Sequence, residues 1–364
     1  MSTKKYIISG GGTGGHIFPA IAIANELKIN DPNCEILFVG AIGRMEMEKV
    51  PQNGYKIIGL PIAGFQRGSI LKNVSLPFKL LKSLLKARSV LKSFKPTAVI
   101  GVGGYASGPL LKVANFMGIP TFIQEQNSYA GVTNKLLSQK AVKIFVAYDG
   151  MERFFPKDKI IITGNPVRQD LNDLDSKKSD AYSYYNLDPN KKTIVVMGGS
   201  LGARTMNEAM DFNYKIIKSR PDIQILWQAG KSYFEKFSQL AVSQLSNVHI
   251  VEFLTRMDLA YSISDIVVAR AGALTISEVC IAGLPTILVP SPHVTEDHQT
   301  KNAENLTNKN AAILITDSTA KENLLKVAFE LMDDIEKCNV LKSEIKKLSK
   351  PDATKIIVNQ ISKI

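Results

Sequence analysis

The sequence predicts an α/β protein of two tandem Rossmann-like domains, each a doubly wound parallel sheet, with a cleft between them. Short apolar runs alternate with helical stretches along all 364 residues, which is typical of parallel sheets covered on both faces. The length favours two domains of ordinary size over one. A strand–glycine loop–helix unit opens the first half and returns after residue 192. We therefore expect ligands to bind outside the carboxyl ends of the strands.

Twelve strands are expected, six in each half of the chain. In the first half they lie near 4–9, 34–40, 97–102, 120–124, 143–148 and 159–163. In the second half they lie near 193–197, 223–228, 248–252, 265–269, 285–289 and 311–315. Helical patterns fill the gaps, for example at 17–29, 105–117, 202–218, 273–282 and 319–333. Two sets of six alternating strands favour two doubly wound domains in tandem.

The turn Thr163-Gly164-Asn165-Pro166 marks the predicted domain boundary. We place a first domain at 1–163, a second at 164–340 and a C-terminal segment at 341–364. That last segment has the pattern of two helices broken at Pro351, and packing back onto the first domain is one arrangement that the sequence allows. Residues 170–188 are polar and poor in core residues, which is typical of a solvated connection.

Several classes of protein are disfavoured by composition. No apolar run reaches the roughly 18–20 residues of a membrane span, and the N-terminus leads at once into a strand, so we expect no signal peptide. The three cysteines, Cys34, Cys280 and Cys338, lie far apart. They fit a reducing compartment and show no metal-ligand spacing.

The positive charge is concentrated in one stretch. Residues 49–124 contain no acidic residue but nine lysines and two arginines, out of a net charge of +12. Such a distribution predicts an acidic partner: an anionic membrane surface, a nucleic acid or a phosphorylated substrate. Nucleic acid ranks low, because no binding motif appears and few aromatic residues are present to stack bases.

The segment 64–95 mixes apolar and cationic residues in the way that membrane-resting surfaces do. For residues 75–95 alone, an ordinary amphipathic core helix with lysines in water is the favoured interpretation. The lack of acid across 49–124 favours contact with anionic lipid. The leucines in question are Leu80, Leu81, Leu84, Leu85 and Leu91, and the lysines are Lys79, Lys82, Lys86, Lys92 and Lys95.

The glycine-rich run 9–16, SGGGTGGH, follows the first strand and opens a helix. Its N–H groups are expected to face outward, where the helix dipole favours a phosphate or a developing negative charge. The run also matches the dinucleotide fingerprint, but Glu35 lies at the wrong end of the second strand for a nicotinamide enzyme. His16 is either a general base near neutral pH or a first-turn residue that bonds the loop; a tight turn without a ligand is the remaining alternative.

Two acidic positions carry competing interpretations. Glu278 follows a glycine turn and could accept hydrogen bonds from the paired hydroxyls of a ribose, or it could complement a helix dipole. Asp173 and Asp175 have the spacing of a divalent-metal pair in some sugar-nucleotide enzymes. Because they lie in a polar segment away from any strand end, we favour a solvated connection and no metal site.

Taken together, the motifs resemble those of the MurG family. That family comprises UDP-N-acetylglucosamine transferases that complete the lipid-linked precursor of bacterial peptidoglycan. The matching motifs, in family order over residues 5–303, are GGGTGGHIFPA at 10–20, GGYASGP at 103–109, EQN at 125–127, GNPVR at 164–168, GGSLGA at 198–203, RAGALTISE at 270–278, HQ at 298–299 and NA at 302–303.

The resemblance implies a GT-B fold, no cofactor and no divalent metal, and a peripheral position on the cytoplasmic face of the cell membrane. Its substrates would be UDP-N-acetylglucosamine and lipid I, whose N-acetylmuramyl 4-hydroxyl would be glycosylated with inversion to give lipid II. By position, His16 would be the base and Glu278 would bind ribose. The nucleotide and its diphosphate would be surrounded by Leu254, Ala273, Leu274 and Thr275, with Ser200 and Arg168 near the diphosphate. The hydroxyls of the donor sugar would be bound by Gln299. The acceptor side of the site would be lined by Thr13, Gly14, Gly15 and Asn127.

Departures and rivals remain open at this point. Gln124 stands where some relatives have histidine, so no role is assigned to it. A transferase acting on another lipid acceptor, a UDP-sugar epimerase and a membrane-docked sugar-nucleotide binder without turnover are the alternatives.

Overall fold

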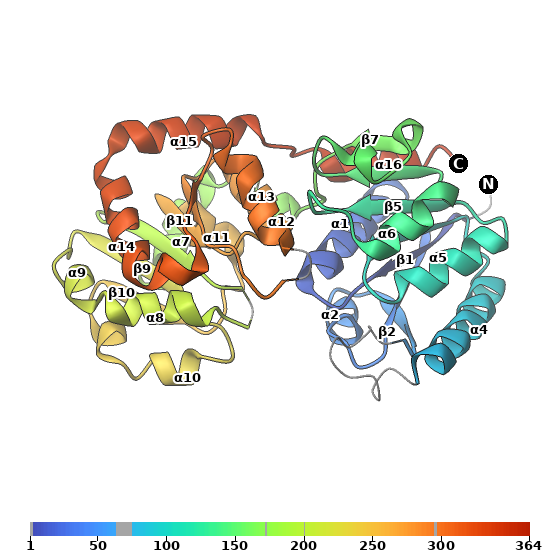
Figure 1. Cartoon of the computed structure of the whole chain (residues 1–364), viewed down its shortest axis with the longest axis horizontal. Coiled ribbons are helices and arrows are strands. Elements are labelled where there is room, and N and C mark those ends of the chain that lie inside the picture. The colour runs from blue at the N-terminus through green and yellow to red at the C-terminus, as the bar shows by residue number, and fades with distance from the viewer. Residues whose placement is uncertain (1–2, 63–74, 172, 200, 295–296) are drawn as a thin grey trace. The chain divides into compact units, whose positions relative to one another are not determined.

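The chain folds into two compact units (Figure 1). The computed structural model describes residues 3–62, 75–171, 173–199, 201–294 and 297–364. The first unit combines residues 1–168 with 351–364, and the second spans Gln169–Lys350. The structure thus divides the chain at 168/169 and at 350/351, and the C-terminal segment contributes to both units.

Among the described residues, the first unit contains a parallel sheet of seven strands in the order β3-β2-β1-β4-β5-β6-β7. The strands are β1 (Lys5–Gly10), β2 (Glu35–Ala41), β3 (Lys56–Leu60), β4 (Ala98–Gly103), β5 (Thr121–Glu125), β6 (Lys143–Val146) and β7 (Ile160–Ile162). The expected count of six was wrong because β3 was missed. This strand lies at the sheet edge and is only half buried, so its apolar pattern is weak.

Helices cover both faces of this sheet. They are α1 (Gly14–Asn30), α2 (Glu46–Gln52), α4 (Leu76–Phe94), α5 (Ser107–Phe116), α6 (Val132–Leu137) and α16 (Ala353–Ile361), with 3₁₀ turns at Ser138–Lys140, Met151–Arg153 and Lys157–Lys159. In β1, Ile7 belongs to the core on one face, while Tyr6 and Ile8 belong to the core on the other. This double burial is why the strand is a continuous apolar run.

The two ends of the chain meet in the first unit (Figure 1). Helix α16 packs against α1, and Ile357 and Ile361 are buried in the same core as Tyr6. At the surface, the Lys4 ammonium donates to the carbonyl of Ile364 at 2.8 Å. The last helix is therefore an integral part of the first unit.

Among the described residues, the second unit contains a six-stranded parallel sheet in the order β10-β9-β8-β11-β12-β13. Its strands are β8 (Lys192–Met197), β9 (Ile223–Gln228), β10 (Val248–Val251), β11 (Ile266–Ala269), β12 (Thr286–Leu288) and β13 (Ile313–Leu314). Together the two sheets confirm the predicted fold class of two doubly wound parallel-sheet domains.

The second unit's helices alternate with these strands. They are α7 (Lys178–Tyr185), α8 (Arg204–Phe212), α9 (Tyr214–Lys218), α10 (Phe234–Phe237), α11 (Met257–Ser262), α12 (Ala273–Ala282), α13 (His298–Thr307), α14 (Asp317–Asp333) and α15 (Ile335–Lys347), with 3₁₀ turns at Gln169–Leu171, Asp175–Lys177 and Ala241–Gln244. The single helix expected over 202–218 is divided at Asn213. The buried amide of this residue donates to the carbonyls of Ala209 and Lys321 at 2.8 and 3.0 Å.

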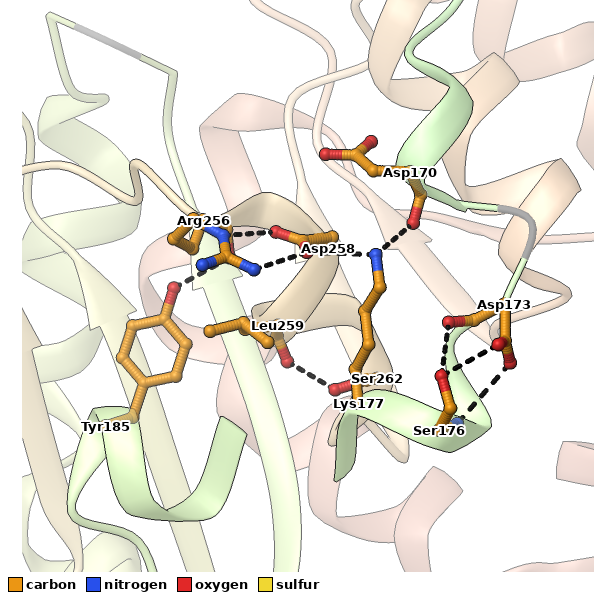
Figure 2. A network of polar contacts seen from close by, with 9 residues as sticks. All are labelled: Asp170, Asp173, Ser176, Lys177, Tyr185, Arg256, Asp258, Leu259 and Ser262. Atoms are coloured by element: carbon orange, nitrogen blue, oxygen red, sulfur yellow. Dashed lines mark hydrogen bonds and ion pairs between the residues drawn. The ribbon is translucent and has the colours of Figure 1, made fainter. Parts of the chain in front are cut away.

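The polar segment 170–188 is anchored to the second unit by an ionic network (Figure 2). Lys177 donates to the Asp170 carbonyl at 2.6 Å and to Asp258 Oδ2 at 3.0 Å. Arg256 binds the same carboxylate through two hydrogen bonds of 2.8 and 2.9 Å. The Arg256 guanidinium holds the pKa of the Asp258 carboxyl well below its usual range, against the opposing effect of burial. The segment is folded onto α11, although the Asp175 side chain is exposed.

Candidate functional site

Each sheet has one point where the strand order reverses, and such switch points bind ligands in open α/β sheets. In the first unit the reversal lies between β1 and β4, and in the second unit between β8 and β11. The glycine-rich loops at 10–15 and 198–203 directly follow β1 and β8. These loops and their neighbours are therefore the candidate site residues of each unit.

His16 lies in the first turn of α1, half buried. The Thr13 carbonyl receives the N–H groups of His16 and Ile17, and His16 Nδ1 lies 3.0 Å from the Gly11 carbonyl oxygen. A carbonyl can only accept, so this contact is a hydrogen bond when Nδ1 carries the proton. The neutral ring then has its lone pair on Nε2, which is the atom a general base needs.

The loop after β4 is shaped around this imidazole. A Cβ on Gly103 would lie 2.6 Å from His16 Cδ2 and 2.7 Å from Nε2, and Gly103 has a positive φ of 102°. Only glycine fits such a position. The two loops flanking the switch point therefore meet at His16.

The N–H groups of the first glycine loop do not all face outward, as the sequence had led us to expect. Gly12 N donates to Glu46 Oε2 at 2.7 Å, and Ala41 N donates to Glu46 Oε1 at 2.9 Å. The prediction is wrong for Gly12, because a buried carboxylate takes its hydrogen bond. Glu46 was missed by sequence reasoning, since nothing in its local pattern marks a contact 34 residues away.

Asn127 lies in the loop after β5, which a second buried carboxylate organises. Glu125 Oε1 accepts from Asn127 N at 3.1 Å, and Oε2 accepts from Gly131 N at 3.0 Å and Asn134 Nδ2 at 2.9 Å. Gln126 Nε2 ties this loop to the end of β4 through the Val102 carbonyl at 2.8 Å. The position of Asn127 thus depends on Glu125, to which the sequence analysis gave no role.

Gln124 has a structural role at the position where no function was assigned. Its side chain is fully buried, and Nε2 donates to Asn165 Oδ1 at 3.0 Å. Asn165 Nδ2 in turn donates to the Gln126 carbonyl at 3.1 Å. These bonds join β5 to the Gly164-Asn165-Pro166 turn, which precedes Arg168, the last residue before the division of the chain.

In the second unit, a neutral amide holds the loop after β8. Gln228 Nε2 donates to the Gly199 carbonyl at 2.7 Å, and Gln228 Oε1 accepts from Leu254 N at 3.1 Å. Gly202 has a φ of 85°, and a Cβ there would lie 2.2 Å from the Ala229 carbonyl oxygen. Gln228 therefore joins the loop to Leu254, a buried candidate residue. Ser200, another candidate, lies outside the described residues.

Helix α12 begins at the switch point of the second sheet. Gly272 is its N-cap, and Ala273, Leu274 and Thr275 form the first turn. Glu278 lies beyond that turn and is only 8% exposed, with Oε2 accepting from the Tyr261 hydroxyl at 3.0 Å. The helix-dipole interpretation of Glu278 is therefore wrong, because that effect is confined to the first turn.

Arg270 and Gln299 fix the loop that follows β12. Arg270 donates to the carbonyls of Val289 and Pro290, both at 3.1 Å, and pairs with Asp317 at 2.6 Å. Gln299 Oε1 accepts from Ser291 N at 2.9 Å. Gln299 thus has a backbone partner, and Arg270 is a further organising residue that carried no assigned role.

Asp173 and Asp175 serve the turn that they flank. Asp173 Oδ2 accepts from the Ser176 hydroxyl at 2.8 Å, and Asp175 pairs with Lys178 at 2.8 Å. Over the described ranges, no group of three histidine, cysteine, aspartate or glutamate residues could hold a metal ion. The two carboxylates are occupied by local partners.

The basic helix α4 leaves three of its leucines exposed. Its buried face is formed by Ser83, Ala87, Val90 and Leu91, whereas Leu80, Leu81 and Leu85 are exposed, together with Phe78 at 70%. The ordinary core-helix interpretation therefore fits Leu91 but not the exposed Leu80, Leu81 and Leu85. The part of the basic stretch at 63–74 lies outside the described residues. Within the described part of the chain, no helix is both long and apolar enough to span a bilayer.

The candidate residues fall into two sets. His16, Thr13, Gly14, Gly15 and Asn127 lie along the carboxyl edge of the first sheet, and Arg168 ends that unit. Leu254, Ala273, Leu274, Thr275, Glu278 and Gln299 belong to the second unit. His16 and the first turn of α12 lie at the two switch points, whereas Arg168 and Leu254 follow strands at the sheet edges, β7 and β10.

Comparisons with family models and with individual known proteins indicate the same family. The N-terminal domain model of glycosyltransferase family 28 matches residues 6–146, and the C-terminal domain model matches 193–357. Two similar relatives are named UDP-N-acetylglucosamine–N-acetylmuramyl-(pentapeptide) pyrophosphoryl-undecaprenol N-acetylglucosamine transferase. The Flavobacterium psychrophilum protein is 54% identical over 100% of this chain and 98% of its own length. The Bacteroides thetaiotaomicron protein is 55% identical over 99% and 97%.

Solved structures agree with this assignment. Acinetobacter baumannii MurG is 30% identical, with a TM-score of 0.79 over 99% of this chain and 100% of that one. UDP-GlcNAc 2-epimerase from Neisseria meningitidis, with a TM-score of 0.71 over 100% of both chains, is only 17% identical and shares the fold alone. The family models and full-length relatives show that this chain belongs to glycosyltransferase family 28 and, within it, to the MurG family.

Proposed function

We propose that this chain transfers N-acetylglucosamine from UDP-N-acetylglucosamine to the N-acetylmuramyl unit of a pyrophosphoryl-undecaprenol-linked acceptor, converting lipid I to lipid II. The observation that carries the proposal is 54% identity, over the whole chain, to a curated transferase with that name. The chain is a glycosyltransferase by family. Both glycine loops lie at sheet switch points, where ligands of open α/β sheets bind.

The donor is assigned to the second unit. Glu278 accepts hydrogen bonds from the ribose hydroxyls, and the first turn of α12 at Ala273, Leu274 and Thr275 lies beside the diphosphate, where a helix N-terminus favours anions. Leu254 lies beside the nucleotide. The diphosphate is bound by loop 198–203, which contains Ser200, and by Arg168. The sugar hydroxyls are hydrogen-bonded by Gln299.

The acceptor and the chemistry are assigned to the first unit. His16 Nε2 takes the proton of the N-acetylmuramyl 4-hydroxyl as its oxygen attacks the anomeric carbon. The bond from that carbon to the UDP oxygen breaks on the opposite face, so the product is β-linked. Backbone N–H groups stabilise the charge that grows on UDP. Thr13, Gly14, Gly15 and Asn127 hold the reacting sugars.

The basic and apolar surface of the first unit is assigned to the membrane that carries the acceptor, on its cytoplasmic face. Supporting this, Phe78, Leu81 and Leu85 are exposed on α4 beside lysines, and Phe116 and Leu136 are exposed on α5 and α6. Helix α4 packs on α5, and α5 on α6. Apolar insertion together with cationic attraction is how peripheral proteins bind anionic lipid.

Vesicle co-sedimentation tests the membrane assignment. The parent should bind phosphatidylglycerol vesicles and lose most binding to neutral phosphatidylcholine. A double variant, Leu81→Ser with Leu85→Ser, should bind anionic vesicles several-fold more weakly. Ile335→Ser, at an exposed position on α15, is the matched control and should bind as the parent does. Equal binding of all three proteins would contradict the assignment.

An acceptor screen tests the activity itself. With UDP-N-acetylglucosamine, UDP should be released only when a lipid I-type acceptor is present, and the product should carry one added β-linked N-acetylglucosamine. Glycosylation of diacylglycerol instead would identify a different lipid transferase. A changed sugar in the absence of any acceptor would identify an epimerase, and binding without UDP release would identify a sugar-nucleotide binder.

A further inference from the structure

Glu46 is a buried carboxylate that joins two segments of the first unit. It is 1% exposed and stands at the first position of α2. Its two oxygens accept from Gly12 N at 2.7 Å and Ala41 N at 2.9 Å. A Cβ on Gly11 would lie 2.2 Å from the Glu46 carboxyl group, and a Cβ on Gly40 would lie 2.5 Å from its Cγ. The surrounding glycines leave room for this side chain.

The hydrogen bond from Gly12 links Glu46 to His16 through a single peptide group. The Gly12 N–H and the Gly11 C=O belong to one planar unit and point in opposite directions. Glu46 binds the N–H end, and His16 Nδ1 lies 3.0 Å from the oxygen at the other end. Carboxylate, peptide and imidazole therefore form a continuous chain of hydrogen bonds.

We propose that Glu46 is a positioning residue for His16 and acts through the Gly11–Gly12 peptide. By holding the N–H end, the carboxylate keeps the carbonyl aimed at Nδ1, which fixes the Nδ1–H tautomer and leaves the lone pair on Nε2. A charge at one end of the peptide also polarises it, so the carbonyl becomes a better acceptor as the imidazole gains a proton. In metal sites, carboxylates and carbonyls behind a ligating histidine do the same.

The inference rests on the proposed role of His16 as base, but its geometry can be tested separately. Glu46→Gln keeps the size of the side chain and removes its charge. Whichever way the amide is turned, its NH₂ group faces one of the two N–H donors, so one bond is replaced by a repulsive contact. Glu48→Gln is the matched control, since Glu48 lies on the same helix with its side chain 68% exposed.

The first measurement is the tautomer of His16, read from the ¹⁵N shifts of histidine-labelled protein. The chain has four histidines, and His16→Gln identifies the signal. We expect mainly the Nδ1–H form in the parent and in Glu48→Gln, and a mixture with the Nε2–H form in Glu46→Gln. Circular dichroism and the melting temperature show whether each variant is folded.

The second measurement is kinetic. Glu46→Gln should lower kcat about 10- to 100-fold, by analogy with the loss seen when the partner of a metal-ligating histidine is removed. The KM for UDP-N-acetylglucosamine should stay within about threefold, because we assign the donor to the second unit. In a His16→Gln background the same change should have little further effect, since residues that act as a unit are not additive.

The outcomes separate the two proposals. If His16→Gln retains activity while Glu46→Gln alters the tautomer, His16 is not the base but Glu46 still positions it. If His16→Gln is inactive and a folded Glu46→Gln changes neither the tautomer nor kcat, the inference is overturned. Should Glu46→Gln fail to fold, Glu46→Asp decides: it keeps the charge with a shorter reach, and we expect a partial loss of kcat and a partial tautomer change, whereas parent behaviour in both overturns the inference.

Discussion

The two switch points of this protein have similar backbones but different electrostatics. In the first unit, buried carboxylates accept hydrogen bonds from backbone N–H groups of the candidate loops. Glu46 accepts from the loop after β1, and Glu125 accepts from the loop after β5. In the second unit, the neutral amide of Gln228 holds the loop after β8, and the Arg270–Asp317 pair holds the loop after β12. A negative charge behind a loop opposes a bound anion, whereas a neutral amide does not.

This difference supports the proposed assignment of the substrates to the two units. A glycine loop at a helix N-terminus is expected to bind phosphate, and both units have one. In the first loop, the Gly12 N–H is already hydrogen-bonded to Glu46. This arrangement suits a loop that holds a base beside a neutral hydroxyl. The second loop is better suited to a diphosphate. We expect the variants at the two loop systems to affect either chemistry or nucleotide binding, but not both.

The largest effect is expected from His16→Gln. Loss of a general base lowers kcat by about 10²- to 10⁴-fold, while the affinity for UDP, measured by calorimetry, should match that of the parent. A large loss of UDP affinity in this variant would contradict the proposal that the first unit carries the chemistry while the second unit binds the nucleotide.

Glu278→Gln should produce the opposite pattern. Hydrogen bonds to a charged group contribute about 1.5–3 kcal/mol, so UDP should bind roughly 10- to 100-fold more weakly. Glu322→Gln, at an exposed position on α14, is the control and should bind UDP normally. Unchanged UDP affinity in Glu278→Gln would remove the ribose assignment.

Gln228→Glu sharpens the comparison. It places a carboxylate behind the loop after β8, as Glu46 is placed behind the loop after β1. The donor to the Gly199 carbonyl is lost and a negative charge is added beside the candidate diphosphate loop. A cost of about 1.4 kcal/mol corresponds to a tenfold higher KM for UDP-N-acetylglucosamine. The kcat at saturating donor should change little. A KM equal to the parent's would show that charge behind this loop is unimportant.

Asp258→Asn should have the smallest effect, on stability alone. The lowered pKa of Asp258 means that the unfolded chain takes up this proton at a higher pH than the folded chain. The stabilisation is complete above the unfolded pKa of about 3.9 and declines as the pH falls toward the lower folded pKa. Because Arg256 is half exposed, we expect a loss of about 1 kcal/mol at pH 7.

Chemical denaturation at several pH values checks this expectation. The difference in unfolding free energy between parent and Asp258→Asn should be constant from pH 7 to 5 and shrink below pH 4. A difference that grows on acidification would have the wrong sign for a carboxyl with a lowered pKa.

The sequence was sufficient for the fold class and for most strands, because strands buried on both faces are continuous apolar runs. It failed where the signal depends on packing partners. The edge strand β3 is half buried, and Asn213 divides a helix through a contact with Lys321. The glycine motifs located both switch points, but Glu46, Glu125 and Gln228 were missed. Their roles come from contacts between loops, such as Gly12 with Glu46, that no local periodicity encodes.

The placement of α16 has a consequence for biosynthesis. Ile357 and Ile361 complete the apolar interior around Tyr6, yet they emerge from the ribosome after nearly all of the other residues. The first unit therefore keeps part of its interior uncovered until residues 353–361 have been synthesised. Folding of this enzyme cannot proceed strictly from one end to the other, and removal of the final helix would leave its earliest-made region permanently incomplete.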